Sequence, residues 1–483
     1  MPENNNRVHS YTNDVLGELD AVALAQLIKN KEISAAEVVA ATIARAQKVD
    51  PILHAVVTDN YEKGLAASQE PNNGFFAGVP IYFKDLTYVK GIPTYYGSEA
   101  FANTPPAKKT DPIAQQIFDQ GFINLGTSSM PEFGFTCITE FVNAPATCNP
   151  WNIKHSPGGS SGGAAALVAA GVLPIAHAAD GGGSIRIPAG ACGLVGLKPT
   201  RGRLLKSTMF KSQMVEIATD GIISRSVRDT AYFYAEAEKY YQNPKLPPIG
   251  LVEGPSKKTY RIGFTGDSIK SMKADDTTMA ELNKTVKLLE SMGHTVVPIE
   301  LPIKEQFIDD FINIWGLNAF YCNHLGKRMF GKSYDASKLS KLSKGLSKHH
   351  GKNILKTPFF VKRLRQTSKE YDQMFSDMKL DIILTPTTAG SAPELGYMGM
   401  NLEYEEVFPR IIKWTCFTPY GNAAGGPSIS LPLGYDTKND LPIGMLFWAN
   451  HGQENKLLDL SYQIEAAQPW RKIAEGEFVY EMK

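Results

Sequence analysis

Two serines in a glycine-rich stretch are the residues of this chain best suited to covalent chemistry. Ser184 follows three consecutive glycines, and Ser160 stands upstream in the sequence Gly-Gly-Ser-Ser-Gly-Gly. Because glycine lacks a Cβ and tolerates unusual φ angles, consecutive backbone N–H groups here could converge on one point as an oxyanion hole. Deleting one such donor costs roughly 3–4 kcal/mol of transition-state stabilisation, so we predict that Ser184 attacks a carbonyl carbon. The candidate donors are the amides of Gly181, Gly182, Gly183 and Ser184.

A serine nucleophile needs a base, and the histidines near this stretch do not provide one. His155 is expected in a loop and His177 in an apolar strand, where structural roles are favoured. Lys84 follows the apolar segment 78–83, and a lysine accepts a proton if burial holds it neutral. Lowering its pKa from about 10.4 to about 7–8 takes roughly 4 kcal/mol of differential interaction, which burial can supply. We predict that Lys84 is the base. Without the glycine-rich stretch elsewhere in the chain, it would be interpreted as a surface lysine at the end of a strand.

Three other interpretations of the glycine-rich region 145–203 can be compared with its sequence. A flexible linker does not fit, because the apolar runs 164–170 and 172–178 lie within it. A phosphate-binding loop does not fit, because alanine stands where the Gly-x-x-x-x-Gly-Lys-Ser/Thr motif needs lysine. A nucleophile elbow stays open, since Gly-x-Ser160-x-Gly would make Ser160 the nucleophile of an α/β-hydrolase-type esterase. That enzyme would need a later histidine as base, and none of the candidates has a catalytic context: His349, His350 and His451.

Short apolar runs alternate with helical patterns, which is typical of a sheet covered by helices on both faces. The predicted strands are 54–58, 79–83, 123–125, 172–178, 261–264, 295–299, 381–384, 428–431 and 443–448. The predicted helices are two within 18–49, then 111–120, 161–170, 277–292 and 455–467. A capping box at Ser34 and Glu37 opens the second of these helices, and Pro51 is expected to stop it. Residues 300–375 are helical in pattern, and their basic run is interpreted as a solvated helix face.

Composition excludes several classes of protein. The 483 residues carry 50 Lys and Arg against 49 Asp and Glu, and this net charge of +1 argues against nucleic acid or a membrane as partner. Five scattered cysteines, without zinc-like spacing, predict a reducing compartment and no structural metal. Residues 1–20 do not resemble a signal peptide, and no run of about 18 apolar residues occurs. We therefore expect a cytoplasmic protein with a small-molecule ligand.

The glycine-rich region closely resembles the amidase signature family. Residues 158–163 and 180–188 carry the resemblance, including the separation of the two serines. The resemblance implies an α/β fold, with a single large α/β/α domain over residues 1–483 and a mixed central sheet. Within that domain it places N-terminal helices in 1–70 and a variable helical covering region at 300–375. Other segments similar to the family are 76–85, 126–133, 192–202, 384–387, 426–432 and 441–444.

The resemblance also implies a role for each residue of the site. Ser184, Ser160 and Lys84 would form a triad in which a proton passes from Ser184 through Ser160 to neutral Lys84. A non-proline cis peptide would precede Ser160, and Asp180 and Arg186 would support the glycine loop through charge-assisted hydrogen bonds. No metal, nucleotide or organic cofactor is implied.

The implied activity is hydrolysis of a carboxylic amide through a Ser184 acyl-enzyme. The sequences of the lysine segment and the glycine-rich motif are most similar to those of free amidases, including hydrolases of cyclic and linear 6-aminohexanoate oligomers. The alternative within the family is the glutamine amidotransferase subunit of a tRNA-dependent amidotransferase, which releases ammonia from glutamine in complex with protein partners. A free amidase should hydrolyse simple amides when purified alone, whereas an amidotransferase subunit should be nearly inactive. Whether the protein forms a homodimer stays open.

The substrate pocket is expected to be built outside the motifs. Residues 300–375 and the loop 390–420 concentrate bulky side chains, so Trp315 and Trp414 are predicted to wall a mostly apolar pocket, although core filling would explain each of them alone. Ser128 and Met130 are the further candidates, beside the catalytic segments. Many relatives carry Thr-Asn where this chain has Ser128 and a second serine, which leaves local hydrogen bonding near the site open.

Overall fold

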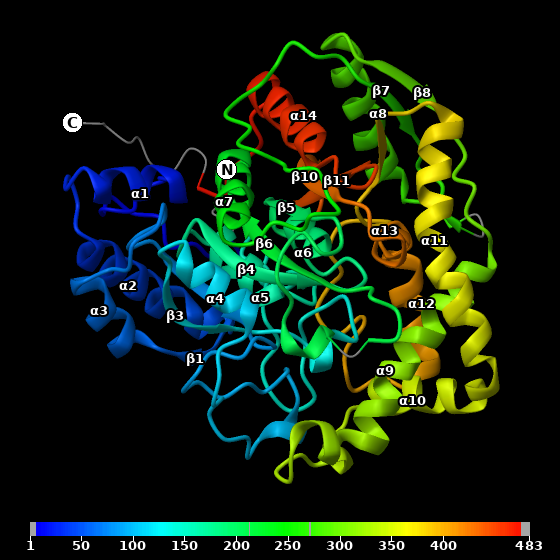
Figure 1. The fold of residues 1–483 in the computed structure, drawn as a ribbon, viewed down its shortest axis with the longest axis horizontal. Coiled ribbons are helices and arrows are strands. Elements are labelled where there is room, and N and C mark those ends of the chain that lie inside the picture. The colour runs from blue at the N-terminus through cyan, green and yellow to red at the C-terminus, as the bar shows by residue number, and fades with distance from the viewer. Residues whose placement is uncertain (1–5, 212, 270–271, 475–483) are drawn as a thin grey trace.

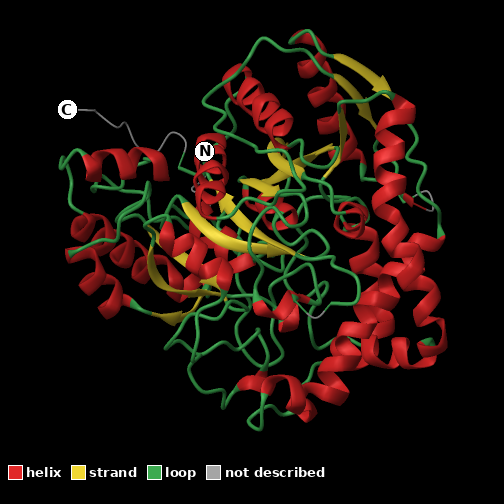
Figure 2. Ribbon diagram, viewed as in Figure 1, coloured by secondary structure: helices red, strands yellow, loops and turns green. Residues whose placement is uncertain are grey.

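A computed structural model describes residues 6–211, 213–269 and 272–474, and its centre is an eight-stranded mixed sheet (Figure 2). The strands of this sheet are β4 (Ile175–Asp180), β5 (Val195–Lys198), β6 (Thr219–Ser224), β7 (Arg261–Phe264), β8 (Thr295–Pro298), β9 (Ile382–Pro386), β10 (Ser428–Asp436) and β11 (Leu441–Ala449). Their order is β4-β6-β5-β10-β11-β9-β7-β8. Neighbours run antiparallel from β4 to β9, whereas β9, β7 and β8 are parallel. The predicted α/β fold with a large mixed sheet is confirmed.

A separate three-stranded sheet carries the lysine segment. It consists of β1 (Val56–Asp59), β2 (Pro80–Lys84) and β3 (Ile123–Ser128) in the order β1-β3-β2. β2 packs beside β4 of the large sheet, but the two strands form no ladder of backbone hydrogen bonds. The end of β2 therefore faces the end of β4, where the glycine-rich loop begins.

Helices cover both faces of the large sheet (Figure 1). α7, α8 and α14 pack on one face, and α5 and α6 pack on the other. Neighbouring residues of a strand accordingly pack on opposite faces of the sheet. Ile222 lies in the core with α7, α8 and α14, and Ile223 lies in the core with α5 and α6. The helices are α1 (Ala21–Lys29), α2 (Ala35–Leu53), α3 (Tyr61–Gln69), α4 (Pro112–Asp119), α5 (Gly162–Ala169), α6 (Arg186–Cys192), α7 (Val227–Tyr240), α8 (Asp276–Ser291), α9 (Gln306–Phe330), α10 (Lys341–Lys352), α11 (Thr357–Met378), α12 (Tyr404–Trp414), α13 (Pro419–Ala424) and α14 (Glu454–Ala467).

The long helices α9, α10 and α11 form a layer at one side of the molecule, far from the N-terminal helices α1 to α3 (Figure 1). α9 contacts both α10 and α11, and α11 contacts the short helix α13 that precedes β10. None of the described helices has the length and apolar character that crossing a membrane requires. This layer occupies the region 300–375, where the sequence predicts helices.

Local sequence explains some helix ends, and two expectations about helix ends need correction. The predicted capping box is present, since Ser34 Oγ accepts from Glu37 N at 3.2 Å and Glu37 Oε2 accepts from Ser34 N at 2.8 Å. The expected stop at Pro51 is wrong, because α2 continues to Leu53 and a proline within the last turn removes a single backbone hydrogen bond. Asp111 stands at the N-cap of α4 as predicted, but its carboxylate accepts from other segments, including Tyr88 N at 3.0 Å.

The sequence also misses two strands, β5 and β6. Both follow the glycine-rich loop, and β6 begins with Thr-Asp-Gly, which lacks the apolar pattern of a buried strand. Their pairing with β4 and β10 joins the glycine-rich segment to the rest of the sheet.

Candidate active site

Lys84 and Ser160 meet at the junction of the two sheets. Lys84 ends β2, and its Nζ lies 2.8 Å from Ser160 Oγ and 3.1 Å from the carbonyl oxygen of Ala179. The lysine is 1 % exposed, so both contacts are made away from bulk water. The structure thus joins the predicted base and the first serine of the motif by a direct hydrogen bond.

The position of Lys84 determines its protonation state. Burial disfavours the ammonium form and lowers the pKa of Lys84 to about 7, against the opposing attraction of the Asp180 and Asp220 carboxylates. The amine is therefore neutral above about pH 7 and can accept a proton from Ser160. This pKa agrees with the value that a lysine base requires.

Ser160 is held in its place by close backbone packing. A cis peptide bond joins Gly159 to Ser160, as the family resemblance implies. A Cβ on Gly159 would lie 2.9 Å from backbone atoms of Cys137 and Ile138, so a side chain could not be accommodated there. The glycine before Ser160 is required by this close approach.

Ser184 and the glycine loop follow β4 directly and lead into α6. Asp180 Oδ1 accepts the N–H of Gly183 at 2.7 Å, so this amide is already engaged within the protein. The expectation that all four amides point at an oxyanion is therefore corrected for Gly183. The amides of Gly181, Gly182 and Ser184 are left as the candidate donors.

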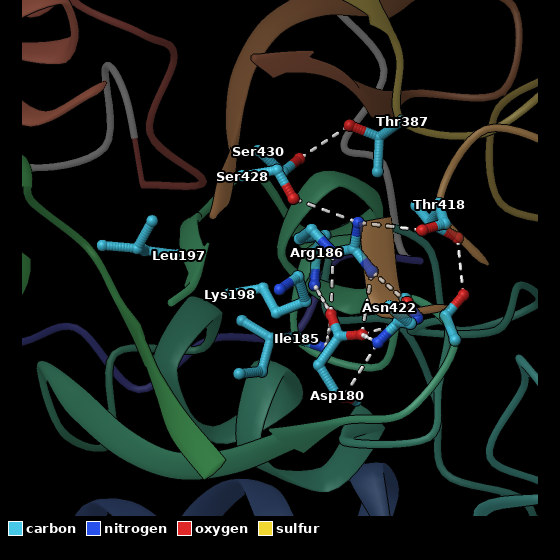
Figure 3. Close-up of polar contacts among 12 residues, drawn as sticks. Asp180, Ile185, Arg186, Leu197, Lys198, Thr387, Thr418, Asn422, Ser428 and Ser430 are labelled. Atoms are coloured by element: carbon cyan, nitrogen blue, oxygen red, sulfur yellow. Dashed lines mark hydrogen bonds and ion pairs between the residues drawn. The ribbon is translucent and has the colours of Figure 1, made fainter. Parts of the chain in front are cut away.

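Asp180 and Arg186 form the buried support of this loop (Figure 3). Arg186 Nε donates to Asp180 Oδ2 at 2.8 Å and Nη2 donates to Asp180 Oδ1 at 2.9 Å, and both side chains are fully buried. Burial alone would raise the pKa of Asp180, but the charge and hydrogen bonds of Arg186, with a hydrogen bond from Asn422, hold it well below its ordinary value. A paired carboxylate and guanidinium thus fix the loop that carries Ser184.

Two residues that the sequence analysis missed complete this support. Asn422 Oδ1 accepts from Arg186 Nη2 at 2.6 Å, and Asn422 Nδ2 donates to Asp180 Oδ1 at 2.8 Å. Thr418 Oγ1 donates to the carbonyl oxygen of Gly182 at 2.6 Å. Both residues come from the α13 segment, far along the chain, and nothing in their local sequence marks them (Figure 3).

A second buried lysine lies beside the same cluster. Lys198 on β5 is fully buried, and its Nζ donates to the carbonyl oxygen of Pro199 at 2.9 Å. Burial and then the positive charge of Arg186 lower the pKa of Lys198 to about 7. Two lysines therefore titrate in the same range, and only Lys84 contacts a serine of the motif.

The histidines take structural positions. His177 Nδ1 accepts the backbone N–H of Lys84 at 3.3 Å, and its Nε2 lies 3.3 Å from Asp220 Oδ1. This side chain joins β4 to β2 where the two sheets have no ladder, as a structural histidine would. The late histidine His451 is engaged elsewhere, with Nδ1 at 2.6 Å from Asp372 Oδ1, so the Ser160 elbow finds no base in it.

The three residues of the predicted triad border one cavity of about 480 Å³. Lys84, Ser160 and Ser184 share its wall with Gly181 and Gly182. The opposite walls are largely aromatic, with Tyr88, Tyr96, Phe133, Phe135, Phe210, Phe311, Trp315, Tyr321 and Phe330. None of the described lining residues is acidic, and no group of His, Cys, Asp or Glu among the described residues could hold a metal ion.

Of the four predicted pocket residues, Trp315 borders this cavity and the other three lie in the packed interior. Ser128 is fully buried and its Oγ donates to the carbonyl oxygen of Phe83, while Met130 is fully buried in an aromatic core cluster. Trp414 directs its indole N–H to the carbonyl oxygens of Gly390 and Ser391. These three residues are therefore corrected from pocket walls to core. Another part of the wall comes from residues that the sequence analysis did not name: 208–211, 213, 217 and 218.

Comparison with known proteins defines the class. The family model for amidases matches residues 37–458, and the chain belongs to the amidase signature family, whose members hydrolyse amide carbon–nitrogen bonds. The chain is 40% identical to the putative amidase AmiC of Mycobacterium tuberculosis over 97% of this chain and 98% of that relative. It is 31% identical to the 6-aminohexanoate-cyclic-dimer hydrolase of Paenarthrobacter ureafaciens, covering 93% and 95% of the two chains.

Solved structures lead to the same class. The structure of 6-aminohexanoate cyclic dimer hydrolase complexed with substrate matches with a TM-score of 0.86 at 28% identity, over 95% of this chain and 98% of that one. A bacterial aryl acylamidase matches with a TM-score of 0.80 at 26% identity, over 94% and 96%. The predicted amidase activity on carbon–nitrogen bonds is thus confirmed at the level of the family.

Proposed function

We propose that this amidase works through a Ser184 acyl-enzyme, with Ser160 and Lys84 as its proton relay. The observation that carries the proposal is the 2.8 Å contact between Lys84 Nζ and Ser160 Oγ, in a cavity whose wall Ser184 shares. A buried lysine with a pKa of about 7 has a free lone pair above about pH 7, as a base requires.

The relay accounts for both halves of the reaction. As Ser184 Oγ attacks the amide carbon, its proton passes to Ser160 and the proton of Ser160 passes to Lys84 Nζ. The charge that develops on the carbonyl oxygen is stabilised by the amides of the glycine loop. Lys84 then returns a proton through Ser160 to the leaving amine, and the carbon–nitrogen bond breaks. Water enters the same cavity, loses a proton through the relay and releases the acid from Ser184.

The oxyanion donors depend on the buried ion pair below them. Because Asp180 binds Gly183 N and Arg186 binds Asp180, the turn between β4 and α6 is fixed before substrate arrives. Fixed donors need no reorganisation during the reaction, which is the source of their effect on rate. Asp180 and Arg186 are thus positioning residues.

The cavity favours a neutral, largely apolar amide. Its walls are aromatic, and two relatives of the chain are named as a 6-aminohexanoate-cyclic-dimer hydrolase and an aryl acylamidase. Glutamine carries an α-ammonium group, for which the described lining offers no carboxylate, so the amidotransferase alternative gains no support from this site. The five free cysteines agree with a reducing, cytoplasmic location.

A fluorophosphonate probe tests the assignment of the nucleophile. We expect one covalent adduct on Ser184, mapped by peptide mass spectrometry, and its loss in Ser184→Ala. An adduct on Ser160 in the wild-type protein would contradict the proposal and favour the elbow interpretation. Ser291→Ala, which changes an exposed serine at the end of α8, serves as the matched control.

A further inference from the structure

A buried carboxylate close to the catalytic cavity has no part in the relay described above. Glu132 is 4 % exposed and lies outside the wall of the cavity. Its Oε2 accepts from Ser98 Oγ at 2.6 Å, and its Oε1 accepts from Ser340 Oγ at 2.6 Å, from Ser340 N at 3.0 Å and from Ser343 Oγ. Because burial of a charge is costly unless hydrogen bonds replace its water, this set of neutral donors is suited to a carboxylate.

Three of these four hydrogen bonds come from the N-terminus of α10. Ser340 is the N-cap residue of α10, and Ser343 lies in its first turn. The positive end of the helix dipole lies at this terminus and favours a carboxylate there. α10 packs against α9, which supplies part of the cavity wall. Glu132 therefore attaches its own segment to the helical layer over residues 300–375.

The segment that follows Glu132 contacts the relay. A Cβ on Gly134 would lie 2.8 Å from Ser160 Oγ, so the backbone of Gly134 lies directly against that hydroxyl. Phe133 has φ 50° and ψ 10°, a left-handed conformation that residues with a side chain rarely adopt. Such a conformation persists only where its surroundings hold it. Phe133 N donates to the carbonyl oxygen of Tyr96 at 2.8 Å, and the Glu132 carboxylate provides a second attachment.

We propose that Glu132 is a positioning residue, which holds the turn 133–134 against Ser160 and thereby orients the Ser160 hydroxyl within the relay. This inference rests on the proposed function, because it concerns the relay of that site. The N-terminus of α10 supplies most of the hydrogen bonds, so the helical covering layer contributes to the chemistry as well as to the cavity wall. Without these bonds the turn can move away, and the Ser160 hydroxyl gains orientations in which it does not bond to Lys84 Nζ.

Two substrates with the same acyl group distinguish this role from a general loss of stability. Hexanoyl p-nitroanilide and p-nitrophenyl hexanoate differ only in the leaving atom, which is nitrogen in the anilide and oxygen in the ester. p-Nitrophenolate leaves as an anion, whereas the anilide nitrogen must receive a proton through Ser160 as the carbon–nitrogen bond breaks. A displaced Ser160 hydroxyl therefore slows the anilide more than the ester.

The substitution Glu132→Gln is the direct test. Glutamine keeps the size of the side chain but removes its charge and replaces one acceptor by a donor. We expect kcat/KM for the anilide to fall by about tenfold and kcat/KM for the ester to fall by less than about threefold, because only the anilide needs both directions of proton transfer through Ser160. Rates are measured at pH 8, where the amine of Lys84 is neutral.

Ser343→Ala tests the same attachment from the side of α10 and decides the matter if Glu132→Gln does not fold. It removes one hydrogen bond to Glu132, and alanine suits a helix better than serine does. The ratio of anilide to ester rates should fall by about threefold. Ser347→Ala is the matched control, because Ser347 is a buried serine one turn further along α10 and accepts from Asn323 Nδ2 instead. Its rates on both substrates should equal those of the wild-type protein.

An unchanged ratio of anilide to ester rates in folded Glu132→Gln or in folded Ser343→Ala would overturn the inference and leave amide hydrolysis through Ser184 intact. An equal fall of the ratio in Ser347→Ala would overturn it as well, since that variant keeps every hydrogen bond of the Glu132 carboxylate. The proposed function fails by a different result, which is continued cleavage of the anilide by folded Ser184→Ala.

Discussion

The glycine loop and the wall that α9 supplies through Phe311 and Trp315 border the same cavity but are held by different interactions. Around the loop, Asp180, Arg186 and Asn422 are buried and joined by hydrogen bonds from separate segments. Along the wall, Phe311 and Trp315 contact each other and further rings, with ring centroids 6.3 Å apart. A hydrogen-bonded cluster has one satisfied geometry, whereas packed rings can be exchanged for others of similar volume. We infer from this difference that the residues around the loop determine the chemistry and that the residues of the wall determine which substrate is accepted.

The largest expected effect is the loss of the nucleophile. Ser184→Ala should lower kcat/KM by about 10⁴-fold or more, because no other group in the relay can form the acyl-enzyme. Steady-state hydrolysis of an amide measures the loss, and unchanged thermal unfolding checks the fold. Residual activity above one hundredth of the wild-type value would remove Ser184 from the chemistry.

Removal of the base comes next. Lys84→Ala should reduce kcat by about 10²- to 10⁴-fold, the range for general acid–base catalysis. Rates at pH 8 for this variant and for Lys90→Ala, which changes an exposed lysine after the same segment, measure the effect. A near-native rate for folded Lys84→Ala would show that another group accepts the proton.

Breaking the ion pair tests the support of the loop. Arg186→Met leaves the Asp180 carboxylate buried without its charge partner, which should destabilise the protein by about 3–5 kcal/mol and reduce kcat. Because the pKa of Asp180 is held low in the folded state, its contribution to stability is present near neutral pH and is lost as the pH falls below its ordinary value. Chemical denaturation of both proteins at pH 7 and pH 3 measures this, and the difference between them should shrink at pH 3. An equal difference at both pH values would contradict the account.

Substitutions in the cavity wall should have the smallest effect on the rate of hydrolysis and the clearest effect on the preference between substrates. Trp315→Ala should change the ratio of kcat/KM between a large and a small amide by about tenfold, without abolishing either. Trp414→Ala, a buried residue outside the cavity wall, should cost about 3–5 kcal/mol of stability and leave that ratio unchanged. The reverse pattern would exchange the roles of the two tryptophans.

The sequence predicted the chemical part of the site because chemistry restricts residue type and spacing. Consecutive glycines before Ser184 and an apolar segment before Lys84 are visible without a structure. The hydrogen bond from Gly183 N to Asp180 could not be predicted from the sequence, because it depends on the geometry of the turn between β4 and α6. Asn422 could not be found either, because its partners are distant in the chain and its local sequence is that of a short helix.

The wall was predicted only in outline. A helical pattern over 300–375 is visible in the sequence, but an apolar residue on a helix can face either a cavity or the core. Trp315 faces the cavity, whereas Trp414 is packed in the core. Residues 208–211, 213, 217 and 218 border the cavity because β6, which follows them, pairs with β4 beside the glycine loop. The sequence did not predict β6. Tertiary contacts, rather than local pattern, decide which side chains a substrate meets.

The central claim is that a neutral Lys84 activates Ser184 through Ser160, and the pH dependence of Ser184 labelling by a fluorophosphonate tests it most directly. Because Lys84 must lose its proton to act as base, the wild-type labelling rate should rise with pH through an apparent pKa of about 7. Labelling of Lys84→Ala should be slow and independent of pH in this range, although Lys198 still titrates there. A rise through about pH 7 that persists in Lys84→Ala would contradict the account and assign the titration to another group.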